Sequence, residues 1–260
     1  MEDKSESLIE HLEALRQTLL KCLLSLCIVL PVTLFIAPKF LDWILGVIIQ
    51  DSNITFNFFS PAEVFMLQIK TAMVLALIIC FPYIAKKIWD FILPALYDNE
   101  RKFIKSVVLT ATFLFILGVA FCIFMILPLV IKFGLSFSSD NIHPVFGISN
   151  IINLTLWMSV AFGIMFQMPL ITIALIKSGI ISYETISDKR PYIIIIILIL
   201  AAIFTPPDII SQLMLGVPTY LLFEAGLLFA RKYKKNDNTK KQTLNLTDSN
   251  SQGVEYKDEQ

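Results

Sequence analysis

Histidine and charged residues are scarce in this sequence of 260 residues. There are two histidines, His11 and His143, and 16% of the residues are charged, against about 25% in typical soluble domains. The stretch that comes nearest to a G-x-S-x-G nucleophile turn is 147–150, Gly-Ile-Ser-Asn, which lacks the second glycine. No acidic cluster resembles a two-metal site. We therefore expect a protein without catalytic residues, bound metal or cofactor, which works by binding.

Cysteine is also rare, and no cysteine is placed for a disulfide or a metal site. The four lie in apolar stretches without a C-x-x-C pair or a neighbouring histidine, at Cys22, Cys27, Cys80 and Cys122. We expect them to be small apolar residues within helices. Basic and acidic residues each number 21, so the net charge is zero and a nucleic-acid partner is not expected.

Apolar residues are abundant. They make up 56% of the chain, and the mean hydropathy is +0.74, which is more than a single soluble core of this size could bury. The stretches 106–131 and 151–176 contain no charged residue, and each exceeds the roughly 20 apolar residues that cross a bilayer. The pattern predicts an all-α membrane protein with about six spans, at 19–37, 64–84, 106–131, 151–176, 192–204 and 211–229.

The fifth predicted span, 192–204, is short. It reaches about 20 Å, less than the roughly 30 Å of hydrocarbon in a bilayer. Pro206 and Pro207 end it abruptly, because proline cannot donate the next helical hydrogen bond. We expect the last two spans to form a tight hairpin that thins the bilayer or packs within the protein.

The basic residues predict the orientation. Of 21 lysines and arginines, Lys39 and Lys132 fall in predicted outer segments and Lys70 inside a span, which leaves 21 − 3 = 18 on the inner side. Both termini are therefore predicted to be cytoplasmic. The predicted parts are a cytoplasmic amphipathic helix at 1–18, a six-span membrane domain at 19–230 and a disordered polar tail at 231–260.

Polar residues inside the predicted spans are costly in lipid and indicate function or helix contact. They are Gln68, Lys70, Gln167, Gln212 and Glu224. Lys70 and Glu224 lie near span ends, where long side chains can reach the membrane surface. Gln167 lies near mid-span, so we expect it to hydrogen-bond another helix, of this chain or of a partner.

The largest predicted cytoplasmic loop, 89–101, carries Glu100 among apolar side chains. One interpretation is a weak surface ion pair with Arg101 or Lys105. The other is a site for a basic ligand, because a carboxylate beside apolar side chains can bind a guanidinium group through two hydrogen bonds. The sequence alone leaves both interpretations open.

Five motifs follow one another along the chain. They are H-L-E-A-L-R at 11–16, F-S-P-A-E-V-F at 59–65, W-D-F-I-L-P-A-L-Y-D-N-E-R at 89–101, F-G-I-M-F-Q-M-P at 162–169, and T-P-P-D at 205–208 with Gln212, Pro218 and Glu224. In this order they resemble the TatC family, the signal-peptide receptors of twin-arginine protein export, from about residue 11 to residue 233. The resemblance implies a concave, glove-like bundle in a bacterial cytoplasmic membrane rather than an organellar one.

The resemblance also implies a function. Members bind twin-arginine signal peptides of folded precursors at the cytoplasmic face and recruit single-span TatA-type and, often, TatB-type partners for export driven by the proton-motive force. A homo-oligomer within a larger complex is expected. By this resemblance Glu100 pairs with the arginine motif, and Phe91 and Arg101 frame the site.

The first motif departs from the family. It supplies Arg16, but Ala14 stands where the family has a second signal-binding glutamate. Glu13 points about 100° away on a helix, whereas Glu10 lies one turn earlier on nearly the same face. The hypothesis is that Glu10 or Glu13 replaces the missing glutamate, and the geometry favours Glu10.

Two further roles are implied. A partner helix is expected to dock at Gln167, with Phe166 and Pro169 beside it, although an amide cannot ionise where many relatives have a glutamate. Residues expected to shape the outer loops are Pro61, Glu63, Pro206, Pro207 and Asp208. Two rival functions, a small-solute transporter and an intramembrane hydrolase, predict uptake or hydrolysis by the protein alone, which the family resemblance does not.

Overall fold

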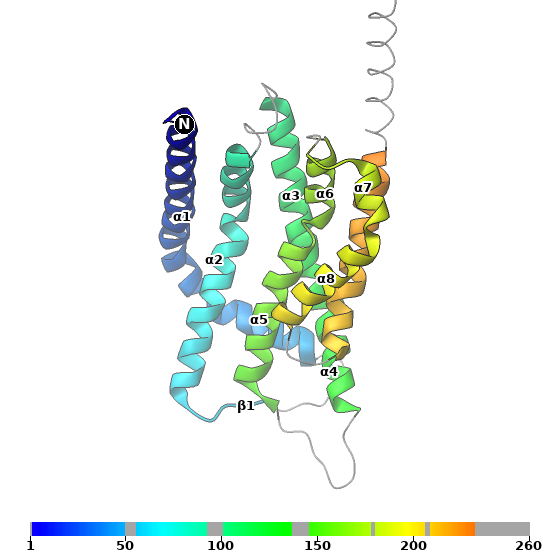
Figure 1. Ribbon diagram of the computed structural model, residues 1–260. Helices are drawn as coiled ribbons and strands as arrows, with labels where there is room; N and C mark the ends of the chain where they lie inside the picture. Colours follow the sequence, from blue (N-terminus) through cyan, green and yellow to red (C-terminus); the bar gives the residue numbers. More distant parts are fainter. Residues whose placement is uncertain are drawn as a thin grey trace, which may run out of the picture.

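The computed structural model describes the backbone of residues 2–49, 56–92, 101–136, 146–177, 180–205 and 209–231. Most of these residues form helices that run between the two ends of one bundle (Figure 1). We call the end that holds the N-terminus and Arg231 the inner end, because the basic residues place it on the cytoplasmic side.

The first helix, α1 (Glu2–Ile49), is 48 residues long. It descends beside α2 and then turns, in its lighter blue part, to cross the bundle near the outer end (Figure 1). Pro31 and Pro38 lie inside it, and a proline bends a helix by removing one backbone donor.

The sequence predicts that the first span ends at residue 37, and this prediction is wrong. Beyond Pro38, the side chains of Leu41, Ile44 and Ile48 recur at helical spacing and are at most 7% exposed. They pack against α2 and α5, so the helix continues because this face enters the core. The helix runs without a break through residue 18, where the boundary between the cytoplasmic part and the membrane domain stays a prediction.

The next two spans are long. The second is α2 (Pro61–Ile92), and the third consists of α3 (Arg101–Phe121), the π-helical turn η1 (Cys122–Ile126) and α4 (Leu127–Leu135). The wide turn has a local cause. Pro128 has no N–H and cannot donate the hydrogen bond that an α-helix would have at this position. The N–H of the neighbouring Leu127 donates to the Cys122 carbonyl five residues earlier, which is the spacing of a π-helix.

The remaining helices form the second half of the bundle. They are α5 (Ile148–Met165), α6 (Met168–Lys177), α7 (Tyr183–Asp188), α8 (Arg190–Phe204) and a last helix, Ile209–Arg231, drawn in orange without a label in Figure 1. By length and composition, five stretches in the described chain are able to cross a membrane: Leu12–Ile48, Pro61–Phe91, Lys105–Leu135, Ile148–Lys177 and Ile209–Arg231. α8, with 15 residues, is the predicted short span.

The outer end is tied together by a small polar cap. β1 (Phe56–Asn57) and β2 (Phe146–Gly147) form a parallel pair, which places the start of α2 beside the start of α5. The Glu63 carboxylate accepts the Phe59 N–H at 2.9 Å and hydrogen bonds from Ser149. Pro61 is the first residue of α2, and the role of Pro61 and Glu63 in shaping the outer loops stays a prediction. The other members of that set, at 206–208, lie outside the described residues.

Close backbone contact between α3 and α5 leaves no space for a side chain at Gly118. A Cβ there would lie 2.6 Å from the Phe162 carbonyl oxygen, which the α5 backbone holds in place. Glycine is therefore required for these two helices to approach each other.

We predict that Gly118→Ala destabilises the protein by about 1–3 kcal/mol, the usual cost of overpacking. Thermal unfolding in detergent measures the change. Gly134→Ala is the matched control, because its Cβ would have no atom within 4 Å. Equal unfolding temperatures for the two variants would contradict the packing described.

Candidate functional site: a groove beside a broken helix

The fourth span is broken in the middle. α5 ends at Met165 and α6 begins at Met168, with a turn at Phe166 and Gln167 closed by hydrogen bonds to the preceding turn. Pro169, the second residue of α6, has no N–H for the Met165 carbonyl, so a regular α-helix cannot continue there. Gln167 is 177 − 167 = 10 residues from the inner end of the span, about 15 Å, which places the break near mid-membrane.

Gln167 bridges the break to a neighbouring helix. Its side-chain Nε2 donates to the Ala111 carbonyl of α3 at 3.1 Å and to the Gly163 carbonyl of α5 at 3.4 Å. The sequence left open whether Gln167 bonds this chain or a partner, and the structure shows bonds to this chain. Both amide hydrogens are used, and within the described residues the Oε1 acceptor has no partner.

The break is also packed tightly against the last helix. A Cβ at Gly226 would lie 2.6 Å from the Pro169 Cα, so the last helix contacts α6 through backbone. Phe166 is 4% exposed and Pro169 is buried. Of the three residues expected at the partner contact, therefore, only Gln167 reaches an open surface, and the other two hold it in place.

Beside Gln167 lies an apolar groove. It has a volume of about 390 Å³ between the inner half of α2 and the α5–α6 break, and Gln167 is the one polar side chain among its lining residues. The lining residues are Phe81, Ala85, Ile88, Trp89, Ile164, Gln167, Ile171, Ala174 and Leu175. A groove of this kind suits an apolar segment.

Two other intramembrane polar residues have partners that the sequence did not predict. The Lys70 ammonium, on an exposed side chain, donates to the Asn153 Oδ1 of α5 at 3.0 Å. Gln212 Nε2 donates to the Leu198 carbonyl at 3.0 Å and ties the last helix to α8. A sequence motif cannot predict which backbone carbonyl accepts a hydrogen bond, because every residue has one.

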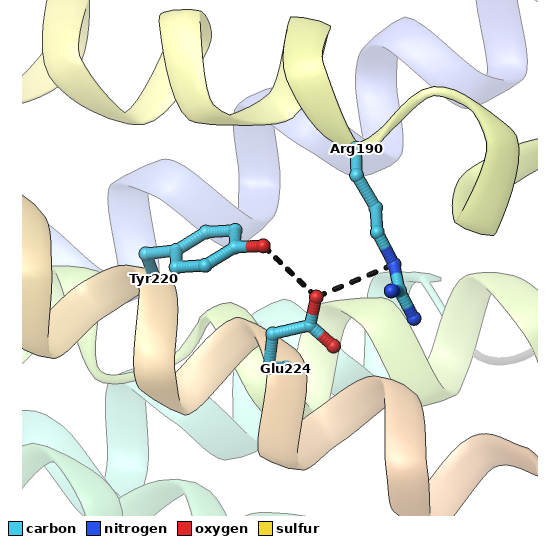
Figure 2. A network of polar contacts seen from close by, with 3 residues as sticks. All are labelled: Arg190, Tyr220 and Glu224. Atoms are coloured by element: carbon cyan, nitrogen blue, oxygen red, sulfur yellow. Dashed lines mark hydrogen bonds and ion pairs between the residues drawn. The ribbon is translucent and has the colours of Figure 1, made fainter.

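Glu224, for which reaching the membrane surface was one interpretation, is paired within the protein. One of its oxygens accepts the Tyr220 hydroxyl at 3.0 Å and lies 3.3 Å from Arg190 Nε (Figure 2). Sequence reasoning missed Arg190 and Tyr220 as partners, although Tyr220 lies one helical turn before Glu224.

The described residues that are expected to bind a signal peptide lie at the inner end. The end of α2 lies there between the start of α1 and the start of α3 (Figure 1). Glu13 and Arg16 are exposed on α1, and Phe91 is half-buried at the end of α2. Glu10 and Arg101 lie in α1 and α3, but their side chains are outside the described part, as is all of Glu100. In the described residues, no group of three or more His, Cys, Asp or Glu is arranged to hold a metal ion.

These features define a multi-pass helical membrane protein with a groove inside the membrane. The family model described as "Sec-independent protein translocase protein (TatC)" matches residues 10–218, and the chain belongs to this family. It is thus a component of the Sec-independent protein translocase, with a role in transport rather than catalysis and in a complex of several subunits.

Individual relatives agree over nearly the whole chain. TatC of Haemophilus influenzae is 34% identical over 244 residues, covering 90% of this chain and 93% of that protein. TatC of Carboxydothermus hydrogenoformans is 33% identical, with 91% and 98% covered. The crystal structure of a twin arginine translocase receptor TatC matches with a TM-score of 0.78 at 30% identity, covering 85% of this chain and 99% of that one. The predicted family, all-α fold and bacterial inner-membrane location are confirmed.

We predict that Gln167→Leu lowers the thermal stability in detergent, because it removes both bridging hydrogen bonds. Such bonds in membrane proteins contribute about 0.6 kcal/mol on average and at most about 1.7 kcal/mol. Gln68→Leu on α2 is the control, since Gln68 makes no hydrogen bond within the described residues. If both variants unfold at the same temperature, the bridge does not contribute to stability.

Proposed function

We propose that this chain is the receptor subunit of a twin-arginine translocase, which binds the signal peptides of folded precursors at its cytoplasmic face. The observation that carries the proposal is that the start of α1, the end of α2 and the start of α3 all lie at the inner end, because these elements carry or border the motif residues (Figure 1). The crystal structure that this chain matches is described as a twin arginine translocase receptor.

The proposed site uses carboxylates for recognition. Glu100 takes the guanidinium group of the arginine motif, and Phe91 and Arg101 frame the contact. Glu10 or Glu13 supplies the second carboxylate, with Arg16 beside it on α1. Arginine is preferred over lysine because its planar fork forms two parallel hydrogen bonds with one carboxylate, which an ammonium cannot.

A second part of the proposal concerns the groove. We infer that a single-span TatA-type or TatB-type partner docks there, within a larger complex that contains further copies of this chain and uses the proton-motive force. The Gln167 amide hydrogens already serve Ala111 and Gly163, so a partner must donate a hydrogen bond to Oε1 rather than accept one. Because an amide does not ionise, the proton switch of the translocase lies elsewhere.

We predict that the purified protein in nanodiscs binds a twin-arginine signal peptide more tightly than its twin-lysine variant. Glu100→Gln should remove this preference and cost about tenfold or more in affinity, as expected for one charged hydrogen-bonding partner. Fluorescence titration of labelled peptides measures both quantities.

The matched control is Asp188→Asn, which removes an exposed inner carboxylate on α7 and should change nothing. The double variant Glu10→Gln, Glu13→Gln should weaken binding if either residue supplies the second carboxylate. Equal affinity for both peptides in the wild type would contradict the receptor function, and solute uptake into liposomes would then be the next assay.

We also predict that a cysteine at position 167, with the native cysteines replaced, forms a disulfide with a cysteine midway along a TatA-type partner helix. Ala174→Phe should reduce this yield severalfold, because the larger side chain fills the groove. Ile116→Phe, at a 51% exposed position of α3, is the control. Absence of crosslinking both from position 167 and from a cysteine at position 171, which lines the groove and leaves the Gln167 bridge intact, would rule out docking in the groove.

A further inference from the structure

The ion pair at the start of α8 uses only part of its hydrogen-bonding capacity. The Tyr220 hydroxyl and Arg190 Nε both contact the same oxygen of Glu224, Oε1, at 3.0 and 3.3 Å (Figure 2). The Arg190 contact is an ion pair without the alignment of a hydrogen bond. Within the described residues, the two terminal guanidinium nitrogens and Glu224 Oε2 have no partner.

These unused groups are accessible from outside the protein. The Arg190 side chain is 40% exposed and that of Glu224 is 24% exposed. Together they present four N–H donors beside one carboxylate acceptor. The planar guanidinium group matches the geometry of a phosphate, and the positive end of the α8 helix dipole adds to its attraction for an anion.

The Arg190–Glu224 pair also lies deeper in the bundle than its inner end. Glu224 precedes the end of the last helix by 231 − 224 = 7 residues, or about 10 Å. In Figure 1, α7 occupies the level between the start of α8 and the inner end. Charged groups at such depth are costly in hydrocarbon, and a short span such as α8 draws the lipid headgroups inward.

We propose that Arg190 and Glu224 bind the headgroup of one phospholipid at the inner side of α8. The lipid phosphate accepts from the terminal guanidinium nitrogens, and an ammonium or hydroxyl of the headgroup donates to Glu224 Oε2. The site therefore favours phosphatidylethanolamine and phosphatidylglycerol over phosphatidylcholine, whose trimethylammonium has no hydrogen to donate. This assignment does not depend on the proposed signal-peptide or partner sites.

Native mass spectrometry of the purified protein tests the site, with each of the three lipids added in turn. The wild type should retain phosphatidylethanolamine and phosphatidylglycerol severalfold more than phosphatidylcholine. Arg190→Lys keeps the charge but loses the planar fork, so it should retain severalfold less of all three lipids. Glu224→Gln should keep phosphate binding but lose the preference among headgroups. Its amide oxygen would accept the Tyr220 hydroxyl, so its N–H₂ donor would stand where Glu224 Oε2 accepts from the headgroup.

Arg231→Lys, at the end of the last helix, is the matched control and should retain lipid like the wild type. Thermal unfolding of each variant shows whether it is folded, and excess inorganic phosphate tests for a simple anion site. Equal retention of all three lipids by the wild type would overturn the proposal. Retention by Arg190→Lys equal to that of the wild type, or displacement of lipid by inorganic phosphate, would do the same.

Discussion

The bridge from Gln167 to α3 is the interaction on which the candidate site depends. Pro169 prevents the fourth span from continuing as one α-helix, so the α5–α6 turn lacks regular helical hydrogen bonds and depends on contacts with its neighbours. The Gln167 amide fixes the turn to the Ala111 carbonyl, while the last helix closes on it through Gly226. Because these contacts are made within the chain, the groove exists before any partner arrives.

A preformed groove allows the protein to work by binding another segment rather than by catalysis. Its walls are almost wholly apolar, so an apolar segment suits it, and the proposed partner would add a hydrogen bond to Gln167 Oε1 near mid-membrane. The proposed peptide site at the inner end adjoins the same helix, because α2 carries both Phe91 and the groove residues Ile88 and Trp89. Signal recognition and partner docking would thus share one rigid element.

The sequence predicted the architecture well where apolar residues form long stretches without a charge. The uncharged stretches became spans, and α8 is as short as its apolar run indicated. It failed at α1, where the apolar stretch suggested an end at residue 37 but tertiary burial of Ile44 and its neighbours extends the helix. The helix propensity of residues 38–49 cannot predict such burial, since the residues that cover Ile44 come from α2 and α5.

The candidate site was predicted less completely, for a physical reason. Gln167 was identified because an amide in mid-membrane is costly, but its partner is a backbone carbonyl 56 positions away that carries no signature. The Lys70–Asn153 contact is similarly non-local, at 83 positions. Glu100 and the second carboxylate at Glu10 or Glu13 remain predictions from the motifs.

The distance between spin labels at Ile88 and Ile171, on the two walls of the groove, tests the central claim most directly. Double electron–electron resonance in lipid nanodiscs, without peptide or partner, should give one narrow distribution in the wild type. The distribution should broaden in Gln167→Leu, because the break is no longer fixed to α3. A broad distribution in the wild type, or the same distribution in both proteins, would contradict a groove held in place by this bridge.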